Sequence, residues 1–178
     1  MRRRAKVINF GILYGMSAVG LAKQLGIGRA EAKLFIETYF ERYPTVRAFM
    51  DDTLERARES GYVQTLLGHR VYVPEINSKN GMQRAYAERT AINAPLQGSA
   101  ADIIKVAMIN LHQRLKLEMP EAKITLQVHD ELVVEAPAAE AEKVAILMKD
   151  TMQYAVALNV PLIVDIGMGD NWFDAHQL

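Results

Sequence analysis

The order of helical and β-rich segments constrains the fold of this 178-residue chain more than any other feature. Glycine and proline divide the first 60 residues into short helical segments, because Gly ends a helix readily and Pro cannot continue one. Alternating residues around Gly68 then predict a short hairpin. The expected helices are 2–14, 17–25, 29–42 and 45–60, and the expected hairpin strands are 62–67 and 70–73.

The second part of the chain mixes helices with β-rich runs. Residues 82–117 read as a long helical stretch interrupted by Pro95 and Gly98. Polar residues 129–131 separate two β-rich runs. The expected elements are strands 123–128 and 132–136, a helix at 138–158 and a final strand at 161–166. Helices followed by strands mixed with helices predict an α+β protein, with a helical lobe beside a small antiparallel sheet.

Composition excludes some classes of site and divides the charge. The chain has no cysteine, so it has neither a disulfide framework nor a Cys-based zinc site. No apolar run approaches the roughly 18 residues of a membrane span. Residues 1–118 hold 18 Lys and Arg against 11 Asp and Glu, whereas residues 119–178 hold 3 against 10. This division suits a polyanion on the basic side and metal ions on the acidic side, although solvated helix faces explain it equally well.

A basic helix opens the chain, and Arg2, Lys6, Phe10 and Tyr14 recur along it at steps of four. Each step advances about 400° and rises about 6 Å, so two cations one step apart could hold both ends of a triphosphate. The helix N-terminus adds free N–H groups and a favourable dipole. We expect Gly15 to end this helix in the left-handed conformation. A basic, solvated turn followed by core aromatics fits the same spacing.

Acidic residues mark the boundary between the two later β-rich runs. Asp130 and Glu131 follow His129 there, and acids are poor strand residues, so a hairpin turn is predicted. A tight hairpin would hold a carboxylate rigidly, which suits Mg²⁺ bound by one or two carboxylates and substrate phosphates. An ordinary solvated turn is the alternative. A zinc site at His129 is not favoured, because no second histidine stands at ligand spacing.

Arg89, Asn93 and Gln97 form another stripe at steps of four, on an Ala-rich helix. Such side chains can bond to minor-groove acceptors or to phosphates without requiring one sequence. Pro95 should bend this helix and change where Gln97 points. The polar face of an amphipathic helix is the alternative.

Several long motifs resemble those of family A DNA polymerases, the bacterial DNA polymerase I group. Residues 2–15, RRRAKVINFGILYG, are similar to the family's fingers-helix motif R-x-x-x-K-x-x-x-F-G-x-x-Y-G. Residues 127–131, QVHDE, are similar to a palm motif, and residues 87–105 and 169–172 (GDNW) also resemble the family. The motifs follow the family's order over essentially the whole chain, and together they outweigh the alternatives that each spacing leaves open.

The resemblance implies roles in nucleotide binding for the first helix. Arg2 and Lys6 would bind the phosphates of the incoming nucleotide, and Lys6 would donate a proton to the departing pyrophosphate. Phe10 would pack on the nucleotide, and Tyr14 would guard the insertion site. Replacing Phe10 with Tyr would ease acceptance of nucleotides that lack the 3′-hydroxyl.

The resemblance also implies roles for the hairpin and the polar stripe. Asp130 would be a ligand in a two-metal Mg²⁺ site that activates the primer 3′-hydroxyl and stabilises the leaving group. Glu131 would support that metal site, and His129 would contact the primer end. The residues expected to touch primer and template are Arg89, Asn93 and Gln97.

The resemblance further predicts a fragment. The family has another palm motif, upstream of the fingers helix, whose aspartate is the other principal metal ligand, and no D-Y-S-x-I-E-like segment occurs in this sequence. We therefore expect residues 1–80 to form the fingers and residues 81–178 the C-terminal part of the palm, without polymerase activity in isolation. Missing neighbours would expose apolar surface, so self-association is expected.

The expected partners are primer–template DNA and dNTPs. We expect no association with a membrane and a location in the bacterial cytoplasm, at the nucleoid.

A fragment of a single-subunit RNA polymerase is one alternative, but Phe10 and Glu131 depart from the pattern of those enzymes. A helix-turn-helix DNA-binding module is another, carried by residues 17–35. Its recognition helix would contain Leu34 and few side chains that read bases.

Overall fold

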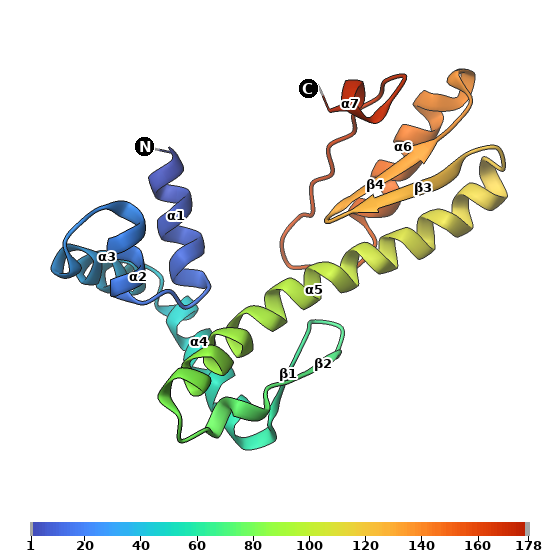
Figure 1. Cartoon of the computed structure of the whole chain (residues 1–178). Helices are drawn as coiled ribbons and strands as arrows, with labels where there is room; N and C mark the ends of the chain where they lie inside the picture. Colours follow the sequence, from blue (N-terminus) through green and yellow to red (C-terminus); the bar gives the residue numbers. More distant parts are fainter. Residues whose placement is uncertain (1, 177–178) are drawn as a thin grey trace. The chain divides into compact units, whose positions relative to one another are not determined.

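The computed structural model describes the backbone of residues 2–176 and the side chains of residues 5–176, in two compact units that divide after Ser99. In the part of the chain described, each unit combines helices with a two-stranded antiparallel sheet (Figure 1). The expected α+β class is therefore confirmed. The expected boundary after residue 80 concerns functional subdomains and stays a prediction.

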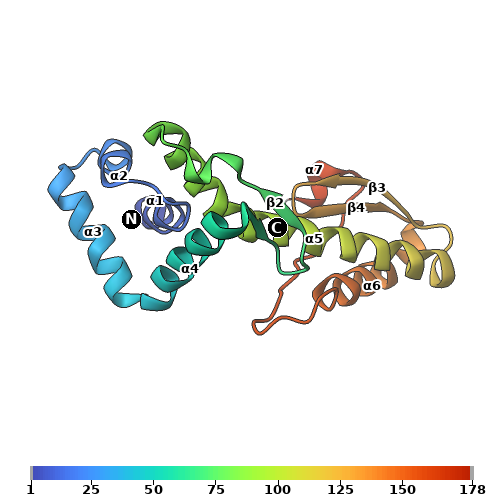
Figure 2. The same cartoon turned by 90° about the horizontal axis from the view of Figure 1, so that it is seen from below.

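Four helices open the first unit, as the sequence predicts. They are α1 (Arg2–Leu13), α2 (Ala18–Leu25), α3 (Arg29–Arg42) and α4 (Pro44–Ser60). Gly15 lies at φ +72°, the left-handed conformation expected after the first helix. The Ser17 side chain caps α2 by accepting a hydrogen bond from the Gly20 N–H at 3.2 Å. Figure 2 looks nearly along α1 and shows the other three helices curving around it.

A short hairpin follows α4. Strand β1 (Tyr62–Gln64) pairs antiparallel with β2 (Arg70–Tyr72), so the expected hairpin is confirmed, with strands shorter than predicted. The Thr65 N–H donates to the His69 carbonyl at 2.9 Å and closes the loop between them. A 3₁₀ turn, η1 (Pro74–Asn77), leads on to α5. The buried core of this part comprises Ala57, Val63, Val73, Ile76, Ala87 and Ala91.

Helix α5 runs without a break from Gly81 to Glu118, so the expected interruption at Pro95 and Gly98 is wrong. A proline removes one helical hydrogen bond. Buried side chains hold the helix in place before and after Pro95, with Ala91 in one core and Ile104 in the other, so the lost hydrogen bond does not end it. Neither α5 nor any other described helix is long and apolar enough to cross a bilayer.

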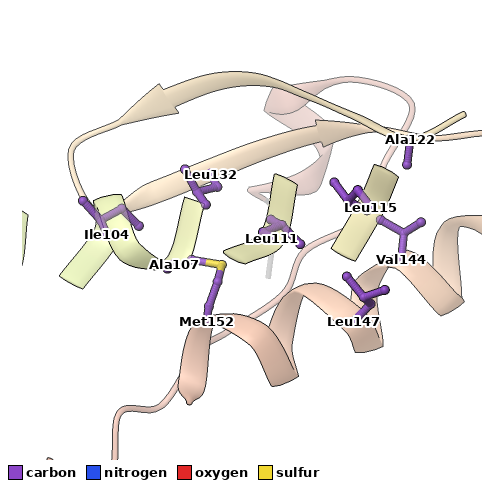
Figure 3. Packing of buried hydrophobic residues seen from close by; sticks show 9 residues of the cluster. All are labelled: Ile104, Ala107, Leu111, Leu115, Ala122, Leu132, Val144, Leu147 and Met152. Carbon is purple, nitrogen blue, oxygen red and sulfur yellow. The ribbon is translucent and has the colours of Figure 1, made fainter. Parts of the chain in front are cut away.

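The second unit is built on a hairpin and the helices packed against it. Strands β3 (Lys123–Val128) and β4 (Glu131–Glu135) pair antiparallel, as predicted. A 3₁₀ turn, η2 (Ala138–Glu140), precedes α6 (Ala141–Gln153). Apolar side chains from α5, β4 and α6 point toward one another (Figure 3). This core comprises Ile104, Ala107, Leu111, Leu115, Ala122, Leu132, Val144, Leu147 and Met152.

The chain after α6 differs from the prediction. The helix ends at Gln153, earlier than expected, because its buried face ends at Met152 and Tyr154 is 78% exposed. The expected strand at 161–166 is wrong. A strand needs a hydrogen-bonded neighbour, and among the described residues β3 and β4 pair only with each other. A short helix, α7 (Trp172–Ala175), follows.

Candidate functional site

One face of α1 lines a hollow of about 660 Å³ in the first unit. Lys6, Phe10 and Tyr14 all line it, because steps of four keep their side chains on one helix face. Arg89 of α5 and Gln24 of α2 complete the polar part of the lining. The hollow therefore combines cationic, amide and aromatic groups from three helices.

A cation and an exposed ring lie side by side in this hollow. The Lys6 Nζ is 5.8 Å from the centre of the Phe10 ring, within cation–π range. The ring centres of Phe10 and Tyr14 are 5.9 Å apart, and Phe10 is 46% exposed. Arg2 belongs to α1, but its side chain lies outside the described residues. Such a surface can hold an anion beside a flat or apolar group.

A second hollow, of about 330 Å³, follows α5 in the same unit. Arg89, Asn93 and Gln97 line it together, as their spacing predicts. The Asn93 Oδ1 is buried without a hydrogen-bond partner among the described residues. Buried polar atoms are nearly always paired, so an unpaired amide oxygen at this position is unusual.

A tight turn joins β3 to β4 in the second unit. Val128 pairs with Glu131, which leaves His129 and Asp130 as the two turn residues. His129 lies at φ +52°, an uncommon conformation for a residue other than glycine. The Gln127 Nε2 donates to the His129 carbonyl at 2.9 Å and supports the turn. Asp130 is exposed, so the turn presents its carboxylate to solvent.

Both carboxylate oxygens of Glu131 are engaged within the second unit. The Trp172 Nε1 donates to Oε1 at 2.6 Å, and the His176 Nε2 lies 3.0 Å from Oε2. No group of three or more His, Asp or Glu residues in the described chain could hold a metal ion. Asp130 alone fits the way Mg²⁺ combines one or two carboxylates with substrate phosphates. Glu131 fits a supporting role better than that of a free ligand.

The structure thus places the expected site residues whose side chains it describes along two hollows of the first unit, both lined by Arg89, and on one turn of the second unit. Sequence reasoning missed Trp172 and His176 as partners of Glu131. Trp172 lies in the GDNW motif, and His176 follows it by four residues. That spacing places two side chains on one helical face, but it does not indicate a partner 41 residues earlier.

Proteins similar to this chain are bacterial DNA polymerases. The DNA polymerase I of Bacillus caldotenax is 53% identical over 175 residues, which cover 98% of this chain and 20% of that protein. The DNA polymerase I of Pseudomonas aeruginosa is 53% identical over 175 residues, with 98% and 19% covered. The chain therefore spans about a fifth of the length of these relatives.

A solved structure and a family model agree with these relatives. The structure is the POL domain of Pol1 from M. smegmatis in complex with DNA primer-template and dNTP. It matches 98% of this chain and 31% of its own chain, with a TM-score of 0.94 and 48% identity. The model of DNA polymerase family A matches residues 1–174, which include the expected site residues. The chain belongs to DNA polymerase family A.

Proposed function

We propose that this chain provides the fingers (residues 1–80) and part of the palm (residues 81–178) of a DNA-directed DNA polymerase, which adds dNTPs to a primer 3′-hydroxyl on a template. The hollow along α1 carries this proposal, because it sets the Lys6 ammonium beside the exposed Phe10 ring. The M. smegmatis protein was solved with a primer-template and a dNTP, which supports the same partners here.

The first helix is proposed to bind the incoming nucleotide. Arg2 and Lys6, one step of about 6 Å apart along α1, bind its triphosphate. Lys6 donates a proton to the departing pyrophosphate, a contribution typically worth about 10²–10⁴ in rate. Phe10 packs on the nucleotide, and Tyr14 limits the insertion site. Transfer of a nucleotidyl group depends chiefly on such positioning and charge, so no nucleophilic side chain is required.

The β3–β4 turn is proposed to serve the metal ions. Polymerases of family A are metal-dependent, and the exposed carboxylate of Asp130 suits Mg²⁺, a hard cation that prefers oxygen. When bound, Mg²⁺ would supply positive charge for the attacking and leaving oxygens. Asp130 stands on a two-residue turn, which fixes the position of its backbone at the end of the hairpin. Glu131 supports this site, and His129 contacts the primer end.

The stripe on α5 is proposed to touch primer and template. Arg89, Asn93 and Gln97 line one hollow and bring it one guanidinium and two side-chain amides. Their guanidinium and amide N–H groups can donate to minor-groove acceptors or phosphates, so such contacts tolerate any sequence. We further propose that the chain acts in the bacterial cytoplasm, at the nucleoid.

The matches do not favour the two alternatives, an RNA polymerase fragment or a helix-turn-helix module. On α3, which would be the recognition helix, Leu34 is 62% exposed and Phe35 is 40% exposed, where side chains that read bases would be needed.

Exposed apolar side chains elsewhere, such as Ile163, support the proposal that the isolated chain self-associates.

A chimeric polymerase tests the proposed function. The 178-residue chain replaces the matching segment of the B. caldotenax DNA polymerase I, and single-turnover primer extension is measured. We expect the chimera to extend primers and Lys6→Ala to slow the chemical step by about a hundredfold or more. Lys23→Ala, an exposed lysine of α2, is the matched control. A folded chimera without extension would contradict the function, and near-normal turnover of Lys6→Ala would remove Lys6 from its role.

A further inference from the structure

A segment more than forty residues further along the chain holds the Glu131 carboxylate. The Trp172 Nε1 donates to Oε1 at 2.6 Å and the His176 Nε2 to Oε2 at 3.0 Å, over separations of 41 and 45 residues. A carboxylate only accepts hydrogen bonds, and bonds to a charged acceptor are the stronger kind. The two rings are one helical turn apart and meet edge to face, with ring centres separated by 5.5 Å.

The helical turn that carries these rings, α7, packs closely against the residues before it. The Asn171 Oδ1 accepts a hydrogen bond from the Asp174 N–H at 3.0 Å and caps α7. A Cβ atom at Gly167 would overlap the Ala175 carbonyl oxygen, and one at Gly169 would lie 2.7 Å from the Ala175 nitrogen. The helix therefore packs directly on the backbone of the two glycines, where no other residue fits without a shift.

From this geometry we infer that Trp172 and His176 are positioning residues, which fix the Glu131 carboxylate beside the turn that carries Asp130. Each carboxylate oxygen keeps another acceptor site besides the bond that it already makes. Trp172 and His176 thus set the direction in which the Glu131 carboxylate can support a cation. The expected effect on catalysis rests on the proposed function. The contact of Trp172 and His176 with Glu131 does not.

Fluorescence of the 178-residue chain tests the contact without any activity, because Trp172 is its single tryptophan. Glu131→Leu removes both acceptors, so we expect lower anisotropy of the indole and stronger quenching by acrylamide. Glu135→Leu, at the other end of β4 and exposed, is the matched control and should leave both signals unchanged. Circular dichroism checks that each variant is folded. Unchanged anisotropy and quenching in folded Glu131→Leu would overturn the inference.

Kinetics of the chimera test the consequence of the contact. Trp172→Phe keeps a ring but removes the donor, and we expect kcat to fall about tenfold, as for one lost hydrogen bond to a charged group, with KM for dNTP little changed. His176→Leu should act alike, whereas His176→Gln keeps an amide donor and should recover part of the rate. Phe173→Ala, at a 72% exposed neighbour, should retain normal kcat.

The two experiments separate the two ideas. If Trp172→Phe and His176→Leu both keep normal kcat in an active chimera, the positioning role is wrong and the proposed function stands. If the unaltered chimera is folded but does not extend primers, the proposed function fails, and the fluorescence experiment still decides whether the turn holds Glu131. Equal losses for His176→Gln and His176→Leu would also count against a role for the donor.

Discussion

At the scale of single residues, the ring of Phe10 is the apolar surface on which we propose that a nucleotide packs. It is 46% exposed, and the Lys6 ammonium and the Tyr14 ring are its neighbours in the hollow. A phenyl ring offers no hydrogen bond to a sugar. Phe10 therefore cannot replace a hydrogen bond that the nucleotide's own 3′-hydroxyl makes.

Phe10→Tyr adds a hydroxyl at this position. We expect the chimera to accept dideoxynucleotides more readily, because the new hydroxyl can replace a hydrogen bond that the missing 3′-hydroxyl would make. The ratio of kcat/KM for dNTP to that for ddNTP should fall by about tenfold, in line with one hydrogen bond. Phe35→Tyr, at a 40% exposed phenylalanine of α3, is the matched control. An unchanged ratio would mean that Phe10 does not face the sugar.

Sequence could name most residues of the candidate site but few of their contacts. Steps of four on a helix necessarily bring Lys6, Phe10 and Tyr14 to one face, so their shared hollow was predictable. The bonds from Trp172 and His176 to Glu131 were not, because they join positions far apart in the chain. Local periodicity carries no information on such pairs.

At the scale of elements, local chemistry sets most of the boundaries. Gly61 lies at φ +77° and ends α4 where the sequence predicts, because glycine adopts this conformation without a steric penalty. Neighbours in space decide the remaining elements. Packing on both sides keeps α5 helical through Pro95, and the apolar run at 161–166 pairs with no described strand. Strand propensity depends on such context, which the sequence alone does not show.

The core of the second unit gives a prediction for one element. Leu111 of α5 is fully buried, whereas Leu117 on the same helix is 84% exposed. Leu111→Ala should lower the free energy of unfolding by about 2–5 kcal/mol, because it leaves a cavity among packed side chains. Leu117→Ala is the control and should change it by less than about 0.5 kcal/mol. Urea unfolding of the chain measures both, and equal losses would show that the packing around Leu111 is wrong.

At the scale of the whole molecule, the basic segment contains the proposed phosphate-binding residues and the acidic segment contains the proposed metal ligand. Residues 1–118 carry the surplus of Lys and Arg and include the cations proposed to bind phosphates, whereas residues 119–178 carry the surplus of Asp and Glu and include Asp130. Opposite surpluses attract opposite ligands, polyanions to the first and cations to the second. The net charge of zero therefore conceals a basic segment and an acidic segment of the chain.

The 178-residue chain by itself should not carry out templated incorporation. Two-metal phosphoryl transfer needs several oxygen ligands held together, and no group of three or more His, Asp or Glu residues between residues 5 and 176 could hold a metal ion. Within the described residues, the turn between β3 and β4 offers only the two neighbouring carboxylates of Asp130 and Glu131. We expect no extension of a labelled primer with Mg²⁺ and dNTPs, with the chimera as positive control on the same template. Extension by the purified chain that Asp130→Asn abolishes would show that these residues assemble a complete metal site, and would overturn the prediction.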